Sequence, residues 1–305
     1  MLYYSVKRFG LALLVAVVVS FLSFQLLFLA SDPAIALAGE AATEEDIIAI
    51  REFYGFDRPV LVQYIDWLGR FIRGDFGYSY YFNLPVSELI LGRLGVTFQL
   101  GLVAVLLAIV VAVPLGVAAA IRPNTIIDRT ALVISVLGQA MPSFWFALVL
   151  IVVFSVNLRW LPASGADSWQ HFILPTIVIA YFAMPAIMRL TRGGMIEVLS
   201  ADYIRTAKAK GLRPFKVLFK HALRNAIIPV VSLAAVQFGF MLSGSIVVET
   251  IFAIDGAGQL AWESINRNDL ATVQALILLF AMIYVMINFL ADLLNAWLDP
   301  RVRVA

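Results

Sequence analysis

The sequence contains no cysteine and only two histidines, His171 and His221, among its 305 residues. The absence of cysteine excludes disulfides, thiolate metal sites and cysteine catalysis. Two histidines leave little material for histidine-based metal chemistry. No Gly-Lys dipeptide occurs, which excludes a phosphate-binding P-loop, and there is no Gly-x-Ser-x-Gly or histidine-rich metal motif. We therefore expect a non-catalytic chain that has no metal site and binds no cofactor itself.

Charge is also scarce: 14% of the residues are charged, against roughly a quarter in soluble domains. In its place, 62% of the residues are hydrophobic, and this composition predicts an all-α integral membrane protein. A helix needs about 20 apolar residues to cross the hydrocarbon. Six stretches come close to that length, at 9–30, 97–121, 131–156, 173–190, 229–248 and 273–290.

The first apolar stretch follows Lys7 and Arg8 and precedes Ala36-Leu37-Ala38, an arrangement that also fits a signal peptide. The stretch is 22 residues long, whereas the apolar core of a signal peptide has about 7–15. We therefore expect a retained transmembrane helix.

Basic residues set the expected orientation. Nine of the 22 Lys and Arg residues lie between Arg189 and Arg224, between two apolar stretches. The positive-inside rule places this segment in the cytoplasm, and both termini with it. The opposite side then holds seven basic residues, most of them in one long segment that has little weight in this rule.

That long segment, 31–95, is predicted to form a small helical cap outside the membrane. Thr43 begins a capping-box-like Thr-Glu-Glu-Asp sequence, Pro59 opens a second helix, and Pro85 opens a third, short one before the second span. Helical spacing puts one apolar face on the second helix, formed by Leu61, Tyr64, Ile65, Leu68, Phe71 and Ile72. The pattern fits a structural lid and a landing surface for a soluble partner equally well.

The basic segment, called here the charged hairpin (191–225), reads as two helices joined by a glycine turn. Gly211 can end the first helix in a left-handed conformation, and Pro214 suits the first turn of the second. The two apolar faces would be formed by Met195, Val198, Leu199, Tyr203, Ile204 and Ala207, and by Phe215, Leu218 and Ala222. Composition alone does not separate a docking surface from a topology-fixing loop or a surface for anionic lipid.

Particular sequences in the charged hairpin resemble the EAA loop of bacterial ABC importer permeases. They are Tyr-Ile-Arg-Thr-Ala-Lys-Ala-Lys-Gly-Leu at 203–212 and His-Ala-Leu-Arg-Asn-Ala-Ile-Ile-Pro at 221–229. The likeness is to the dipeptide, oligopeptide and nickel branch, and it covers nearly the whole chain in order. Further matching motifs lie at 32–34, 55–59, 74–77, 85–88, 141–145, 160–165 and 247–252, and those at 165–171 and 237–240 look like glutathione-type permeases.

Three elements depart from the family pattern. Arg205-Thr206-Ala207 replaces Glu-Ala-Ala, as is usual in this branch. Residues 254–258 resemble a Pro-Gly-Leu-Gly element without its proline, and 268–270 replace an Asp-Tyr/Phe-Pro element.

The resemblance implies a type I ABC importer permease fold with six transmembrane helices, in the bacterial inner membrane. Residues 1–30 would form the N-terminus and first span, 31–95 the periplasmic helical cap, and 96–305 the five-helix core with its hairpin. Implied partners are a second homologous permease, two ATPase subunits that use ATP and Mg, a periplasmic substrate-binding protein and membrane lipid, but no nucleic acid.

The resemblance also implies which residues couple the permease to the ATPase, namely Arg205, Thr206, Ala207, Lys208, Gly211 and Leu212. Polar residues inside spans usually face an interior, so candidates for the translocation path are Gln139, Ser143, Gln237, Glu249 and Asp255. Helix–helix hydrogen bonding explains the same residues. Small residues Gly239, Ser243 and Gly244 fit packing on a partner permease or within the chain. Asp292 is expected to pair with a basic residue such as Arg301 or to cap the assembly.

The expected function is import of peptides, such as di- and oligopeptides or glutathione-like solutes. Nickel or an oligosaccharide is the alternative within the family. An ATP-independent channel or carrier is the alternative outside it, but such proteins usually carry charged residues within their spans. Here the six stretches contain only Arg189, which argues against an ion-coupled carrier.

Overall fold

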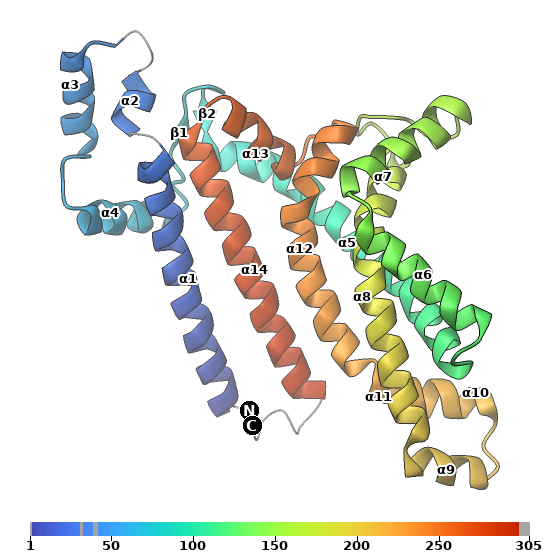
Figure 1. Cartoon of the computed structure of the whole chain (residues 1–305). Coiled ribbons are helices and arrows are strands. Elements are labelled where there is room, and N and C mark those ends of the chain that lie inside the picture. Colours follow the sequence, from blue (N-terminus) through green and yellow to red (C-terminus); the bar gives the residue numbers. More distant parts are fainter. Residues whose placement is uncertain (1, 31–32, 39–41, 299–305) are drawn as a thin grey trace.

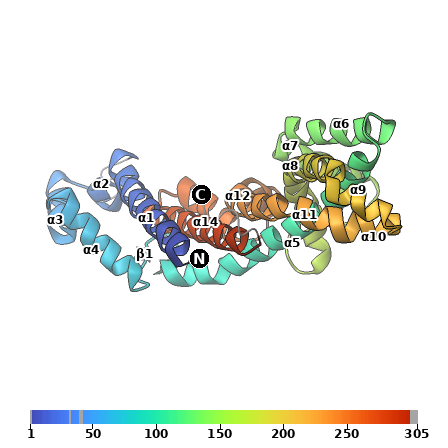
Figure 2. The same ribbon diagram turned by 90° about the horizontal axis from the view of Figure 1, so that it is seen from below.

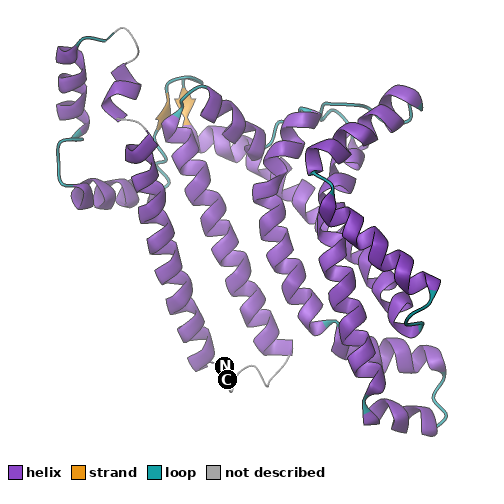
Figure 3. Cartoon of the chain, viewed as in Figure 1, coloured by secondary structure: helices purple, strands orange, loops and turns teal. Residues whose placement is uncertain are grey.

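The computed structural model describes residues 2–30, 33–38 and 42–298, which are mostly helical (Figures 1 and 3). The one sheet among these residues is a short antiparallel hairpin that pairs Tyr78 with Pro85 and Ser79 with Leu84. The elements are, in order, α1 (Leu2–Ala30), α2 (Pro33–Ala38), α3 (Glu44–Tyr54), α4 (Val60–Ile72), β1 (Tyr78–Ser79), β2 (Leu84–Pro85), α5 (Val86–Ile121), α6 (Ile126–Ala140), α7 (Ser143–Leu150), η1 (Ile151–Asn157), η2 (Trp169–Phe172), α8 (Ile173–Ser200), α9 (Asp202–Ala209), α10 (Pro214–Lys216), η3 (Val217–Leu223), α11 (Arg224–Ala226), α12 (Ile228–Phe252), α13 (Ala257–Asn266) and α14 (Leu270–Leu298).

Five of the described helices are long and apolar enough to cross a membrane: α1, α5, α8, α12 and α14. Helices α1, α14 and α12 lie in a row, and α8 continues it on the far side of α12 (Figures 1 and 2). Helix α5 begins beside α13 and α14 and runs obliquely past α12 to pack along α8 (Figure 2). The start of α1, the end of α14 and the charged hairpin lie at the same end of this bundle (Figure 1). The all-helical membrane architecture expected from the sequence is confirmed.

The third expected span, 131–156, is broken rather than continuous. Helix α6 ends at Ala140, Met141 is extended at φ −83° and ψ 128°, and α7 begins after Pro142. Proline lacks an N–H and disfavours a helical conformation in the residue before it, so the Met-Pro pair ends α6. Beyond the break, α7 has 8 residues and the π-helix η1 has 7. The six expected spans are therefore five long helices and one broken pair.

The second expected span also differs, because it merges with the short helix expected at Pro85. Together they form α5, which is continuous over 36 residues. Helix α5 packs closely on α8, and small residues make this possible. A methyl group added at Gly116 would lie 2.7 Å from the Met188 carbonyl oxygen and 2.8 Å from Cβ of Thr191. The core between these helices is rich in fully buried alanine, such as Ala104, Ala108 and Ala112.

Helix α1 packs along α14, and an ion pair ties their ends on the hairpin side. Arg8 Nη1 lies 3.0 Å from Asp292 Oδ2, and the rings of Phe9 and Phe289 meet edge to face at 5.9 Å. Asp292 therefore pairs with a basic residue, as expected. The partner is Arg8 of the first span, whereas Arg301 lies outside the described residues.

The segment between α1 and α5 follows the expected local signals. Thr43 caps α3, its hydroxyl accepting from the Asp46 N–H while the Asp46 carboxylate accepts from the Thr43 N–H. Gly55 ends α3 in the left-handed region at φ 70°. Helix α4 starts after Pro59 and ends at Ile72, before the Gly-Asp-Phe-Gly sequence at 74–77.

The expected apolar face of α4, however, divides in two. Tyr64 is buried and Phe71 half-buried, whereas Leu61, Ile65 and Ile72 are 63%, 64% and 76% exposed. Helix α1 decides the division: the Tyr64 ring packs edge to face on Phe21 at 5.2 Å. The sequence pattern shows only that these positions share a side of the helix, and tertiary contact selects which of them is covered.

Candidate functional site

The charged hairpin begins as an extension of a membrane helix. Helix α8 continues without a break to Ser200, so residues 195–200 belong to it rather than to a separate first helix as expected. Ala201 is extended at φ −69° and ψ 147°, and α9 starts directly after it. Gly211 turns the chain at φ 73°, as predicted. Pro214 opens the second helix of the hairpin, also as predicted; this return helix consists of α10, η3 and α11, at 214–226.

A small apolar core holds α9 against the return helix. Met195, Ile204 and Ala222 have no exposed surface, and Val217 is 3% exposed. The Tyr203 hydroxyl accepts a hydrogen bond of 2.8 Å from Asn225 Nδ2 across the hairpin.

Two residues expected in the apolar faces lie outside this core, since Tyr203 is 43% and Phe215 73% exposed. The Phe215 ring instead packs on the half-exposed Phe219 ring, with centroids 4.4 Å apart.

The six predicted coupling residues divide into an exposed set and a packed set. Arg205, Thr206, Lys208 and Gly211 are exposed. Ala207 is only 7% exposed, and Leu212 is partly buried against the core. The exposed set is therefore accessible to a partner, whereas Ala207 and Leu212 pack into the core of the chain.

The exposed cations of α9 have little internal compensation. The Arg205 guanidinium lies 3.4 Å from Asp202, and both side chains are largely exposed. No ion pair joins Lys208 or Lys210 to any acidic group in the described part of the chain. Solvent-exposed pairs contribute little to stability, so the charge of α9 is available to another surface.

The base of the hairpin is fixed by an ion pair that the sequence analysis did not identify. Arg192 on α8 donates from Nε to Asp128 Oδ1 at 2.5 Å and from Nη2 to Oδ2 at 2.7 Å. Asp128 in the first turn of α6 is buried and also accepts from the Asn124 N–H. The Arg192 hydrogen bonds, followed by the Asn124 bond, lower the pKa of Asp128 from its ordinary value of 3.8. This two-point contact ties the start of α6 to α8 at the base of the charged hairpin.

Of the residues proposed for the translocation path, Gln139 lies near the break between α6 and α7. Its Oε1 accepts a 2.9 Å hydrogen bond from Arg189 Nη1, and both side chains are exposed. Ser143 is half-buried at the start of α7, and Gln237 is half-buried on α12. The structure therefore brings Gln139 together with Arg189, the one charged residue within the expected spans, and leaves Gln237 on a different helix.

Glu249 and Asp255 occupy different surroundings. Glu249 is fully buried, and its carboxylate accepts from Thr97 Oγ1 at 2.8 Å and from the Gln259 N–H at 3.0 Å. It thereby links α12 to α5 and α13 instead of opening to solvent. The Asp255 side chain is 68% exposed and pairs with Arg93 Nε at 2.7 Å.

The glycines that follow Asp255 are explained by Glu249. A Cβ built on Gly256 would lie 2.3 Å from Glu249 Oε2, and one on Gly258 would lie 2.8 Å from the same atom. Only glycine lets the backbone approach the buried carboxylate this closely. The sequence analysis flagged this element through its likeness to Pro-Gly-Leu-Gly, but the reason for the glycines is visible only in the fold.

The small residues of α12 also divide. A Cβ on Gly239 would lie 2.5 Å from the Tyr284 ring of α14, so this glycine serves packing within the chain. A Cβ on Gly244 would meet no atom within 4 Å, and Ser243 beside it is exposed. Gly239 therefore packs within the chain, which is one of the two expected alternatives, and packing of Ser243 and Gly244 on a partner permease stays a prediction.

Comparison with known proteins finds membrane components of transport systems along nearly the whole chain. Residues 112–304 match the family model for the binding-protein-dependent transport system inner membrane component. Residues 1–101 match the model for the N-terminal part of a binding-protein-dependent transport system membrane component. The glutathione transport system permease protein GsiC of Escherichia coli (strain K12) is 40% identical over 304 residues, covering 99% of each chain. A probable peptide ABC transporter permease protein, y4tP of Sinorhizobium fredii, is 38% identical over 309 residues, covering 98% of this chain and 99% of its own.

A solved structure shares the fold at lower identity. A chain of the MetNI methionine ABC transporter in an inward-facing conformation matches with a TM-score of 0.59 and 20% identity, covering 70% of this chain and 97% of its own. The chain belongs to the family of inner membrane components of binding-protein-dependent transport systems, and it is the permease subunit of an ABC importer.

Proposed function

We propose that this permease moves peptides, such as di- and oligopeptides or glutathione-like solutes, into the cell. It would work with a second homologous permease, two ATPase subunits and a periplasmic binding protein. The names of the GsiC and y4tP relatives support the peptide class. Both termini and the charged hairpin would lie in the cytoplasm, in keeping with the positive-inside rule.

The observation that carries the coupling role is the exposed charge of α9 on a rigid support. Helix α8 is continuous over 28 residues, which span about 42 Å at 1.5 Å per residue. One helix therefore connects the membrane core to the hairpin, and the Arg192–Asp128 ion pair ties α6 to its inner end. A displacement of α9 by the ATPase subunits would move α8 and α6 together.

In this scheme the chain hydrolyses nothing itself, and ATP with Mg acts on the partner ATPase subunits. ATP shifts the permease between inward-facing and outward-facing states only as far as the ATPases bind those two states with different free energy. The exposed Arg205, Thr206, Lys208 and Gly211 would contact the ATPase surface. Ala207 and Leu212 would keep α9 packed on the return helix, so that the motion is passed on.

Solute would cross beside the break between α6 and α7, where Gln139 and Arg189 form an exposed polar pair. Ser143 and Gln237 are further candidates for this path. Asp255 would lie at the outer mouth, and the buried Glu249 would shape that mouth through its bonds to α5 and α13. Arg189 is cationic, so the path favours solutes that carry a carboxylate over a bare nickel ion.

The test is ATP-driven uptake by proteoliposomes that contain the complex co-expressed from the neighbouring genes. Di- and tripeptides including glutathione would be offered together with the binding protein, and nickel and an oligosaccharide would serve as competing substrates. Uptake of a peptide that requires ATP and the binding protein is the expected result. Uptake that persists without the ATPase subunits would overturn the proposal in favour of a channel or carrier.

A Gly211→Pro variant tests the hairpin itself. Gly211 has φ 73°, and its N–H donates to the Lys208 carbonyl at 2.9 Å, whereas proline fixes φ near −65° and has no N–H. Uptake is expected to fall to the ATP-free level while the complex still co-purifies. Gly211→Asn is the matched control, because asparagine tolerates the left-handed region and a Cβ at this position meets no atom within 4 Å. Equal loss in both variants, or in neither, would contradict a coupling role for this turn.

A further inference from the structure

Helix α4 presents three distinct faces. Tyr64, Trp67 and Phe71 form an aromatic face, in which Tyr64 and Trp67 contact Phe24 of α1 at ring distances of 5.8 and 5.5 Å. Gln63, Asp66 and Arg70 form a polar face. The third face is an aliphatic stripe at helical spacing, formed by Leu61, Ile65, Leu68 and Ile72; Leu68 is half-buried and the others are exposed. Among the residues that the structure describes, Leu61, Ile65 and Ile72 of the stripe remain exposed.

The contact with α1 fixes the depth of α4. Tyr64 Oη lies 2.7 Å from Ser20 Oγ, and Arg8 near the other end of α1 pairs with Asp292. Ser20 and Phe24 lie about 18 and 24 Å along the helix from Arg8 at 1.5 Å per residue. With Arg8 at the inner boundary of a hydrocarbon layer about 30 Å thick, Tyr64 lies about 6–12 Å below the outer boundary. Helices that lie in the membrane interface bury their apolar face by a similar amount, about 5–10 Å.

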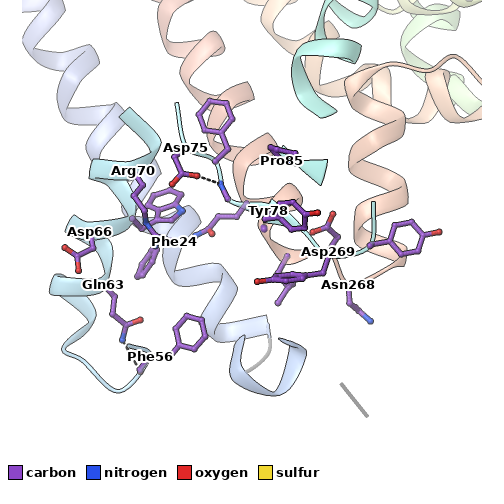
Figure 4. Close-up of a pocket in the computed structure, with 18 of the residues that line it drawn as sticks. Phe24, Phe56, Gln63, Asp66, Arg70, Asp75, Tyr78, Pro85, Asn268 and Asp269 are labelled. Atoms are coloured by element: carbon purple, nitrogen blue, oxygen red, sulfur yellow. Dashed lines mark hydrogen bonds between the residues drawn. The ribbon is translucent and has the colours of Figure 1, made fainter. Parts of the chain in front are cut away.

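The polar face of α4 points to the aqueous side. Gln63, Asp66 and Arg70 line a cavity of about 710 Å³ together with Arg267 and Asn268, which precede the outer end of α14 (Figure 4). The Arg58–Asp66 ion pair of 3.0 Å, with both side chains about half exposed, lies on the same side. The aliphatic stripe therefore faces away from water, at the depth of the outer leaflet.

The surroundings of α4 favour lipid as the occupant of the stripe. Helices α1 and α4 lie at the end of the row opposite α6 and the charged hairpin (Figures 1 and 2). Along α1 itself a continuous apolar surface remains open: Leu14, Val18 and Leu22 are 62%, 50% and 56% exposed. Arg73 at the end of α4 is also exposed, and its side chain has the length to reach a phosphate group while its stem stays in the apolar layer.

We propose that α4 is an interfacial helix, whose stripe of Leu61, Ile65, Leu68 and Ile72 is covered by phospholipid of the outer leaflet. The segment between α1 and α5 is then not a cap that stands clear of the membrane. Lipid holds its α4 side, and only the opposite side, with the cavity and α3, faces a soluble binding protein. This inference rests on the membrane topology and not on the transported solute.

The absence of cysteine from the chain makes a direct test possible. Single-cysteine variants Ile65→Cys and Asp66→Cys would be spin-labelled in the complete complex and reconstituted into phosphatidylethanolamine–phosphatidylglycerol nanodiscs. These neighbouring positions are both exposed in the chain but belong to different faces of α4. The label at position 65 is expected to collide severalfold more with oxygen, which partitions into lipid, than with a water-soluble nickel chelate. The label at position 66 is expected to show the reverse preference.

Two other results at position 65 would overturn the proposal. A label at position 65 that prefers the nickel chelate would place the stripe in water and overturn the proposal. Protection from both reagents would assign the stripe to a protein partner, such as the second permease, and would overturn it too. Co-purification of the ATPase subunits reports whether each variant is assembled. Because neither readout needs transport, a failure here is distinguishable from a failure of the peptide-import proposal.

Discussion

The two ends of the molecule carry charged segments between apolar helices, and they handle charge in opposite ways. At the end that holds α4 and α13, two acidic groups are enclosed: Glu249 is fully buried with its donors, and Asp269 accepts from Ser79 and Thr272 while only 8% exposed. In the charged hairpin, Arg205, Lys208 and Lys210 project from a small apolar core. These two carboxylates are satisfied by the chain's own donors, whereas the hairpin leaves its cations exposed, and we propose that another subunit binds them. The first of these patterns indicates a structural role and the second indicates an interface.

Among the substitutions that test this difference, Glu249→Ala should reduce the stability of the protein most. The substitution leaves the buried Thr97 hydroxyl and Gln259 N–H without an acceptor and opens a cavity, so the free energy of unfolding should fall by about 3 kcal/mol. Thermal unfolding of the purified complex measures it. Glu249→Gln keeps the shape and should lose less. If Glu249→Ala instead left stability intact and altered solute selectivity, Glu249 would belong to the translocation path.

Thr43→Ala should have an intermediate and local effect. Loss of an N-cap hydroxyl destabilises a helix by about 1 kcal/mol, here α3. Hydrogen exchange of the α3 amides reports this, with α4 as the internal reference. The hydrogen bonds that Thr43 donates to the Asp46 carboxylate lower the pKa of Asp46 from 3.8. The stabilisation of α3 by these bonds is therefore present above pH 3.8 and is lost as the pH falls through the lowered pKa. Faster exchange in α4 as well would show that the two helices unfold together.

Arg205→Ala should change stability least, by less than about 0.5 kcal/mol, because the side chain is 77% exposed with only a long contact to Asp202. ATP hydrolysis stimulated by the binding protein should nevertheless fall severalfold. Arg122→Ala is the matched control, since Arg122 is also an exposed arginine on the hairpin side of the membrane. An equal decrease in both variants would point to general electrostatics rather than to a contact made by α9.

Much of the local structure was predictable. The capped start of α3, the left-handed Gly211, Pro214 at the start of the return helix and the five long apolar helices all follow from signals within a few residues of each position. The expected third span is not one continuous helix: the composition of 131–156 is apolar throughout, and the break that Met141-Pro142 imposes appeared only in the fold.

The remaining features depended on residues far apart in the chain. No local pattern pairs Arg192 with Asp128, Arg8 with Asp292, or Glu249 with Thr97, because each pair joins helices whose register is set by packing. Nor could periodicity tell which half of the α4 face meets α1, since all its residues are apolar.

The sequence by itself determined that this chain is a membrane-spanning helical protein with a cationic hairpin, because hydropathy and backbone preferences act locally. Its likeness to ABC importer permeases comes from the ordered motifs and not from hydropathy. The tertiary structure alone decided which polar residues are enclosed and which remain open to partners. Burial of a side chain depends on what the neighbouring helices bring to it.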